Sequence, residues 1–187
     1  SMSDCLVSLV YDEPWDCYGQ PDLATRQGNR IMRFSPFNTY AAKDGTVAIG
    51  AATQVDWENL LEVMDRNDLK NDQNYTNSSW RISNNADVDA IVANWTKSRP
   101  VATIIEQCTE REIACSPIRE ASDLMNWEHL QHRQLLTPTY HPDYPCIEGP
   151  LAAAFPLKFS DANVGYNSPS AHLGEHNKSV MQAWLDE

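Results

Sequence analysis

Three segments in the middle of the chain share one spacing of apolar residues. In each, large apolar side chains recur at positions i, i+3, i+4 and i+7, which places them in a single stripe along a helix. The stripes are formed by Trp57, Leu60, Leu61 and Met64, by Val88, Ile91, Val92 and Trp95, and by Val101, Ile104, Ile105 and Cys108. Because an apolar stripe must be buried, the pattern predicts three helices that pack on a common core.

A β-hairpin is predicted just before the first of these helices. Residues 37–42 and 46–51 have the composition of short strands, and Lys43, Asp44 and Gly45 separate them. Asp-Gly is typical of a type I′ turn, in which both central residues take positive φ. We therefore interpret Asp44 as a turn residue, and Asp56 as the N-cap of the helix that follows.

Other local signals complete the first two thirds of the chain. Asn84 or Asn85 can cap the second helix, and Pro100 suits the first turn of the third. Outside the hairpin and the three helices, the sequence predicts a helix at 3–13, a linker at 14–33, a surface loop at 67–85 and a short strand at 113–118.

The sequence of the last third of the chain predicts several short helices and strands. We expect a helix at 123–134 with Leu124, Trp127 and Leu130 facing inward, and strands at 135–140 and 155–159. A final helix has an apolar face formed by Val180, Met181, Trp184 and Leu185.

The fold class that these elements indicate is α/β (α+β), with three main helices against a small sheet and an arm at each end. We expect an N-terminal helix and linker at 1–33, a small α/β domain at 34–150, and a C-terminal strand, loop and helix at 151–187.

Composition narrows the class of partner. Hydrophobic residues make up 42% of the chain, enough for a sizeable core, and the formal net charge is −12. Such a charge repels polyanions, so we expect neither nucleic acid nor an anionic membrane surface as a partner. No apolar run is long enough to span a membrane, and no signal peptide is evident. Five cysteines without CxxC spacing favour reduced thiols and a cytoplasmic location.

His172-Leu-Gly-Glu175-His176 matches the H-x-x-E-H pattern of a zinc hydrolase. That reading needs both histidines on one helix, so that two imidazoles share a face. Pro169 and Gly174 instead favour a helix that begins near Gly174. We therefore expect no metal site, and a zinc hydrolase stays only as an alternative hypothesis.

Arg26, Arg30 and Arg33 form the one basic cluster of this acidic chain that could meet a phosphate or carboxylate. The alternative is a solvated linker whose arginines pair with the abundant acidic residues. No Walker A, G-x-G-x-x-G or G-x-S-x-G motif is present. Nothing distinguishes any one aspartate as a catalytic group, so no catalytic residue is assigned.

Two separated segments carry a resemblance to a known family. One runs from Arg26-Gln-Gly-Asn29-Arg30 through Ser35-Pro36-Phe37-Asn38-Thr39-Tyr40 to Lys43-Asp44-Gly45. The other is Pro169-Ser-Ala-His172-Leu173-Gly174-Glu175-His176-Asn177. In this order, and with Arg99-Pro100 opening a helix between them, they resemble the second half of a family III CoA-transferase. That group includes formyl-CoA and carnitine CoA-transferases and 2-methylacyl-CoA racemases.

The resemblance implies an assembly. Family subunits form interlocked dimers, and the terminal arms of the small domain pack on a large domain. The active site lies between the large domain of one subunit and the small domain of the other. We therefore expect the partner of this chain to be a second copy, in a homodimer, or an upstream large-domain fragment.

The resemblance also implies a division of the chemistry. In the family, coenzyme A is a substrate, no separate cofactor is used, and the reaction passes through an aspartyl-CoA thioester and mixed anhydrides. The nucleophilic aspartate lies in the half upstream of the matching residues, so we expect this chain to be inactive alone, as a truncated product or one piece of a split enzyme. The residues expected to face the substrate are Asn29, Arg30, Pro36, Asn38 and Tyr40.

A rival hypothesis belongs to another class. The chain could be an autonomous oligomeric binding or assembly module that kept the fold and lost catalysis. Apolar surface that once contacted a large domain would then be covered by self-association.

Overall fold

The computed structural model describes residues 1–10, 18, 26–31, 33–138, 143, 151–165 and 170–186. The chain divides into two compact units, Ser1–Ile118 and Arg119–Glu187. The secondary structure is a mixture of helices and short antiparallel strands, which confirms the expected α/β (α+β) class. The domain boundaries expected from the sequence stay a prediction.

The first unit contains a three-stranded antiparallel sheet with the order β1-β2-β3. Strand β1 covers Phe37–Ala41, β2 covers Thr46–Gly50 and β3 covers Ala114–Pro117. Phe37 pairs with Gly50 and Val47 pairs with Pro117, so β2 is the middle strand. The predicted hairpin and the strand after the third helix are both confirmed.

The turn of the hairpin differs from the expectation. Neither Asp44 nor Gly45 has a positive φ, so the predicted type I′ turn is wrong. A four-residue loop is closed instead by the N–H of Ala42, which donates to the carbonyl of Gly45 at 2.8 Å. The Asp44 carboxylate accepts the backbone N–H of Val101 at 2.7 Å and so caps a helix far along the chain.

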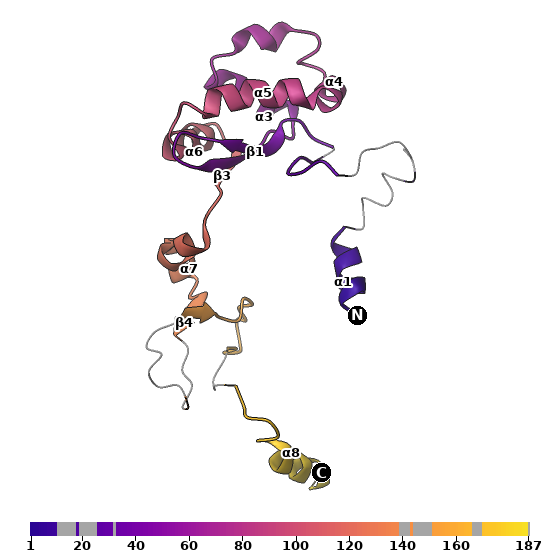
Figure 1. Cartoon of the computed structure of the whole chain (residues 1–187), viewed down its shortest axis with the longest axis vertical. Coiled ribbons are helices and arrows are strands. Elements are labelled where there is room, and N and C mark those ends of the chain that lie inside the picture. Colours follow the sequence, from indigo (N-terminus) through magenta and orange to yellow (C-terminus); the bar gives the residue numbers. More distant parts are fainter. Residues whose placement is uncertain are drawn as a thin grey trace. The chain divides into compact units, whose positions relative to one another are not determined.

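The three predicted helices are confirmed as α3 (Gln54–Val63), α5 (Asn85–Thr96) and α6 (Val101–Glu110). Helix α5 packs on β1 and α6 packs on β3, while α3 contacts α6. In Figure 1 α5 lies along the hairpin. The core consists of the fully buried part of each stripe together with inward side chains of the sheet: Val47, Ile49, Trp57, Leu60, Leu61, Val88, Val92, Ile104 and Cys108.

The start of α3 corrects one assignment. Thr53, rather than Asp56, is the N-cap, and its hydroxyl accepts the N–H of Asp56 at 3.1 Å. The Asp56 carboxylate in return accepts the N–H of Thr53 at 2.9 Å. Asp56 is therefore the third residue of a capping box, a role that also stabilises the helix start.

The predicted surface loop at 67–85 contains two short helical turns. A 3₁₀ helix, η1, covers Asn67–Asn71, and α4 covers Ser78–Ser83. Asn84 occupies the N-cap position of α5, as expected, but its side chain does not cap that helix. Its amide nitrogen donates instead to the carbonyl of Trp80 in α4, at 2.9 Å.

Among the described residues, fewer are buried in the second unit than in the first. The helix predicted at 123–134 is interrupted at Trp127, between the 3₁₀ helix η2 (Ala121–Asn126) and α7 (Glu128–His132). Trp127 and Leu130 are half-buried, whereas Leu124 is exposed. Strand β4 (Leu136–Pro138) pairs with β5 (Leu151–Ala153). Residues 155–159 form no strand, and Pro156 lacks the N–H that a ladder needs.

Two helices near the ends of the chain carry exposed apolar faces. Helix α1 (Met2–Leu9) and helix α8 (Asn177–Leu185) have no buried residues. The predicted apolar face of α8 includes Trp184, which is 72% exposed. The rest of the first predicted helix, at 11–13, and most of the linker lie outside the described residues. No helix in the described part of the chain is long and apolar enough to cross a bilayer.

Candidate functional site

The segment that carries Arg30 lies beside the first strand of the sheet. Gly28 has a φ of +66°, a backbone conformation that glycine adopts without strain. The side-chain amide of Asn29 donates to the Thr39 hydroxyl at 2.8 Å. The N–H of Ile31 donates to the carbonyl of Phe37 at 3.4 Å. These contacts hold residues 29–31 against β1 and place Arg30 next to α5.

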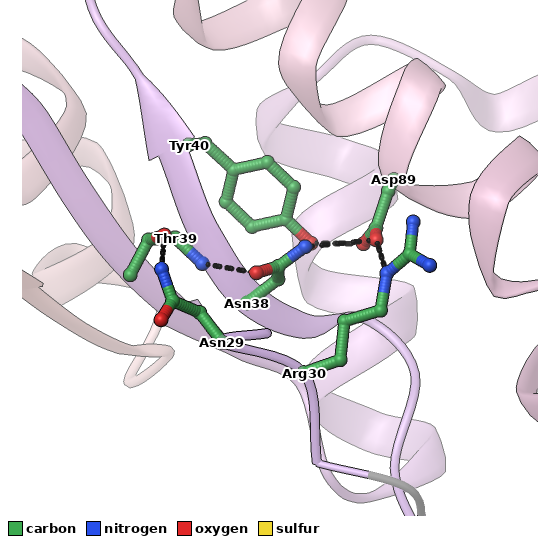
Figure 2. A network of polar contacts seen from close by, with 6 residues as sticks. All are labelled: Asn29, Arg30, Asn38, Thr39, Tyr40 and Asp89. Atoms are coloured by element: carbon green, nitrogen blue, oxygen red, sulfur yellow. Dashed lines mark hydrogen bonds and ion pairs between the residues drawn. The ribbon is translucent and has the colours of Figure 1, made fainter. Parts of the chain in front are cut away.

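Asp89, on α5, joins the linker, the strand and the helix (Figure 2). Its Oδ2 accepts the Arg30 Nε–H at 2.6 Å and the Asn38 side-chain amide at 2.9 Å. Its Oδ1 accepts the Tyr40 hydroxyl at 2.6 Å. One carboxylate therefore receives three donors, which come from residues 49 to 59 positions earlier in the chain.

Burial strengthens this network. The side chains of Asp89 and Arg30 are 12% and 33% exposed, and Tyr40 is 3% exposed. Burial first, and then the hydrogen bond to Asp89, raises the pKa of the Tyr40 phenol above its usual 10.0. Tyr40 therefore stays neutral and remains a donor to Asp89 across the physiological pH range. A low local dielectric makes each of these contacts stronger than it would be in water.

The chemistry open to Asp89 is limited by its donors. A carboxylate that attacks a thioester must approach the substrate with a free lone pair. Three donors take three of the roughly four lone-pair positions of the Asp89 carboxylate, and the residue is only 9% exposed. Its position favours holding other groups in place over attack on a substrate.

Arg30 is the member of the network that can meet a ligand. It uses only Nε in its contact with Asp89. In Figure 2 the two terminal nitrogens lie beyond that contact, on the side away from Asn38 and Tyr40. Within the described part of the chain these two nitrogens have no hydrogen-bond or ion-pair partner. Their N–H groups form the edge of a guanidinium that suits bidentate contact with a planar anion.

A second arginine holds the loop that precedes β1. Arg81, on α4, is 1% exposed and donates its Nε to the carbonyl of Ser35 at 3.1 Å. Its Nη1 donates to the Gln54 side chain at 3.0 Å and to the carbonyl of Tyr75 at 2.7 Å. The Ser35–Pro36 peptide bond is cis, and both residues are buried. Arg81 thus ties the start of β1 to α3 and α4.

The five residues expected to face the substrate occupy different depths. Asn29 is exposed and Arg30 is partly exposed, whereas Pro36 and Tyr40 are buried. Asn38 is half-buried, and both ends of its amide are engaged, with the N–H of Thr39 donating to its oxygen at 2.8 Å. Arg30, Asn38 and Tyr40 meet at Asp89, while Asn29 contacts Thr39. Their assignment to a substrate-facing surface stays a prediction.

Of the basic cluster found in the sequence, Arg30 alone is joined to Asp89 in the described structure. Arg26 and Arg33 are exposed. No pattern in the sequence pointed directly to Asp89 or Arg81. The available signal was that Asp89 borders the apolar stripe of α5, between Val88 and Val92, where an acidic side chain needs a partner.

The H-x-x-E-H pattern lies outside this network, in the second unit. Helix α8 begins at Asn177, so His172 and His176 do not share a helix. The Glu175 carboxylate accepts the backbone N–H of His172 at 2.7 Å, and Nε2 of His172 lies 3.0 Å from Asp143. Among the residues that the structure describes, no group of three or more His, Cys, Asp or Glu side chains could hold a metal ion.

Comparison with protein families gives one match that covers most of the chain. The model of CoA-transferase family III matches residues 1–177. The chain is 29% identical to a succinyl-CoA:mesaconate CoA-transferase of Haloarcula hispanica, over 97% of this chain and 44% of that protein. It is 27% identical to the beta subunit of a succinyl-CoA–L-malate CoA-transferase of Chloroflexus aurantiacus, over 93% of this chain and 43% of that subunit.

Solved structures show the same fold. A CAIB/BAIF family protein from Brucella suis matches 96% of this chain and 46% of its own length, with a TM-score of 0.72 and 19% identity. Rv3272 of M. tuberculosis matches with a TM-score of 0.75 and 16% identity, over 96% of this chain and 46% of that one. The chain spans less than half the length of the relatives that it matches.

Proposed function

The chain belongs to CoA-transferase family III, and we propose that it takes part in moving coenzyme A from an acyl-CoA to a free carboxylic acid. The family match over residues 1–177 is the observation that carries this proposal. The two relatives described above are named for succinyl-CoA as donor and for mesaconate or L-malate as acceptor. Both acceptors are dicarboxylic acids, so succinyl-CoA and a short dicarboxylic acid are the proposed substrates.

We propose that residues of this chain shape the acid-binding side of the site and that the attacking carboxylate comes from a large domain. Two observations support this division. Asp89, the buried carboxylate of the network, has both oxygens engaged. Asn29 and Arg30 are the accessible members of the expected substrate-facing set, and Pro36, Asn38 and Tyr40 lie beneath or beside them. The partner that supplies this carboxylate is then a large-domain fragment, and the 187 residues are inactive alone or paired with a second copy in a homodimer.

An assay of coenzyme A transfer tests this proposal. The purified chain is incubated with succinyl-CoA and mesaconate or L-malate, and the new thioester is measured by chromatography. We expect no turnover by the chain alone. The DNA just before its coding region is read, and any polypeptide encoded there is co-expressed with the chain. We expect transfer to appear with such a partner. Transfer by the chain alone would contradict the proposed division of the site.

The exposed apolar helices favour a second candidate, an assembly module that does not catalyse. Leu6 of α1 and Trp184 of α8 are 64% and 72% exposed, and such side chains are commonly covered in an assembly. Light scattering of the isolated chain separates the two candidates. A stable oligomer that forms without a partner and shows no transfer favours the module. Aggregation of the chain alone, relieved by a large-domain fragment, favours the enzyme.

A further inference from the structure

Two arginine–aspartate pairs in this chain differ in a way that bears on function. Arg66 gives both Nε and Nη2 to Asp68, at 2.8 and 2.9 Å, so this pair uses one whole edge of the guanidinium. The two residues are neighbours on an exposed turn. Arg30 gives only Nε to Asp89, and the terminal edge of its guanidinium has no partner in the described part of the chain.

The orientation of the Arg30 side chain is fixed by Asp89 and by the contact of the neighbouring residue Asn29. Asp89 cannot turn freely, because Tyr40 and Asn38 donate to it at 2.6 and 2.9 Å. The neighbouring residue Asn29 is tied to Thr39 at 2.8 Å, which fixes the backbone on the other side. A long side chain that is ordered before a ligand arrives loses less conformational entropy on binding. Arg30 is therefore arranged as a preorganised cation rather than as a mobile surface charge.

We propose that the terminal edge of Arg30 binds one carboxylate of a short dicarboxylic acid, the one that does not react, with Asp89 as the residue that positions Arg30. The identity of the ligand rests on the proposed function. A guanidinium edge offers two parallel N–H groups that match the two oxygens of a carboxylate. Asp89 offsets the charge of Arg30, and this suits a singly charged carboxylate better than a phosphate, which favours several cations together.

A binding experiment on the chain itself tests the contact directly. Succinate is titrated into the ¹⁵N-labelled chain, and the amide signals of Asn29, Arg30 and Ile31 are followed by NMR. We expect saturable shifts at millimolar succinate, equivalent to a dissociation constant of about 1–10 mM. Inorganic phosphate, titrated in parallel, is expected to bind more weakly. Absence of saturable shifts with succinate, or tighter binding of phosphate, would overturn the proposal.

Variants with matched controls assign the effect to Arg30. Arg30→Gln is expected to abolish the shifts and Arg30→Lys to weaken binding at least about fivefold, because an ammonium cannot form the paired contact. Asp89→Asn is expected to weaken succinate binding while circular dichroism shows that the fold is kept. Arg66→Gln and Asp68→Asn make the same charge changes in the exposed pair and should leave binding unchanged. Equal binding by Arg30→Gln and the unaltered chain would contradict the assignment.

An activity experiment on the assembled transferase distinguishes this inference from the proposed function. With one acyl-CoA donor other than succinyl-CoA, so that transfer to succinate forms a new thioester, kcat/KM is measured for succinate and for butyrate, which has a methyl group in place of the second carboxylate. Arg30→Gln and Asp89→Asn are expected to lower the preference for succinate about tenfold or more. Transfer with an unchanged preference would overturn the role of Arg30 and leave the proposed function in place. Absence of transfer to any acid, with succinate binding intact, would overturn the proposed function alone.

Discussion

The hydroxyl of Tyr40 donates a 2.6 Å hydrogen bond to Oδ1 of Asp89, across 49 residues of chain. Tyr40 lies on β1 and Asp89 on α5, so this contact joins the sheet to the helix that packs on it. Both groups are buried, and water cannot replace either partner without opening the core.

Removal of the Tyr40 hydroxyl should therefore destabilise the fold. We expect Tyr40→Phe to lower the free energy of unfolding by about 1.5–3 kcal/mol, the range for a hydrogen bond to a charged group. Urea denaturation followed by circular dichroism measures the change. Tyr75→Phe is the matched control, because in the described structure the Tyr75 hydroxyl makes no hydrogen bond. Equal losses in the two variants would contradict the role given to the Tyr40–Asp89 contact.

The same contact predicts how stability depends on pH. Burial and the hydrogen bond raise the pKa of Tyr40 in the folded state above its usual 10.0, so the unfolded chain loses this proton first. The contribution of Tyr40 to stability is fully present below about pH 10 and declines as the pH rises toward the raised value. Above about pH 10 the unaltered chain should lose up to about 1.4 kcal/mol more per pH unit than Tyr40→Phe.

Urea denaturation of both proteins between about pH 8.5 and 11 checks this difference. Lysines also titrate in this range, but their contribution is common to the two proteins and cancels in the comparison. Parallel stability curves for the two proteins above pH 10 would show that Tyr40 ionises equally easily in the folded and unfolded chain.

Arg81 should be among the residues least tolerant of substitution. It is buried and donates to three acceptors, two of which are backbone carbonyls. We expect Arg81→Lys to lower the free energy of unfolding by about 2–4 kcal/mol, because an ammonium cannot reach all three acceptors in the same plane. The exposed Arg111, which pairs with Glu62 at 2.7 Å, provides the control. Arg111→Lys should change stability by less than about 0.5 kcal/mol. A similar small loss for Arg81→Lys would refute the prediction.

The cap that Asp44 provides for α6 can be tested by two substitutions at one position. Asp44→Ala removes the acceptor for the Val101 N–H and is expected to cost about 1 kcal/mol of stability. Asp44→Ser keeps a capping oxygen and should recover most of that loss. Thermal unfolding of the two variants compares them. If Ala and Ser at position 44 prove equally destabilising, the effect belongs to the hairpin turn and not to the helix cap.

Elements with a local signature could be predicted from the sequence. The stripes of α3, α5 and α6 follow a periodicity that depends only on neighbours three and four residues away. The hairpin was placed correctly by Asp44-Gly45, but its turn type was not. The Asp44 side chain is held by Val101 of α6, 57 residues later, and no local rule contains that contact.

The arrangement of the candidate site depends still more on contacts between residues far apart in the sequence. Arg30 was recognised from the sequence as a basic residue that could meet an anion, but its orientation comes from Asp89, 59 residues away. The Asn, Asp and Ser content of residues 67–85 predicts a loop. That composition did not reveal that Arg81 would be buried in α4 and hold the loop around Ser35.

Helix α4 has only six residues, too few to persist in isolation. An asparagine closes each of its ends: the Asn77 side chain accepts the N–H of Trp80 at 3.2 Å, and the Asn84 amide donates to the carbonyl of Trp80 at 2.9 Å. Because Asn84 also occupies the N-cap position of α5, fraying at the junction would disrupt both helices at once. The two helices should therefore open as one cooperative unit in native-state hydrogen exchange, with a common opening free energy.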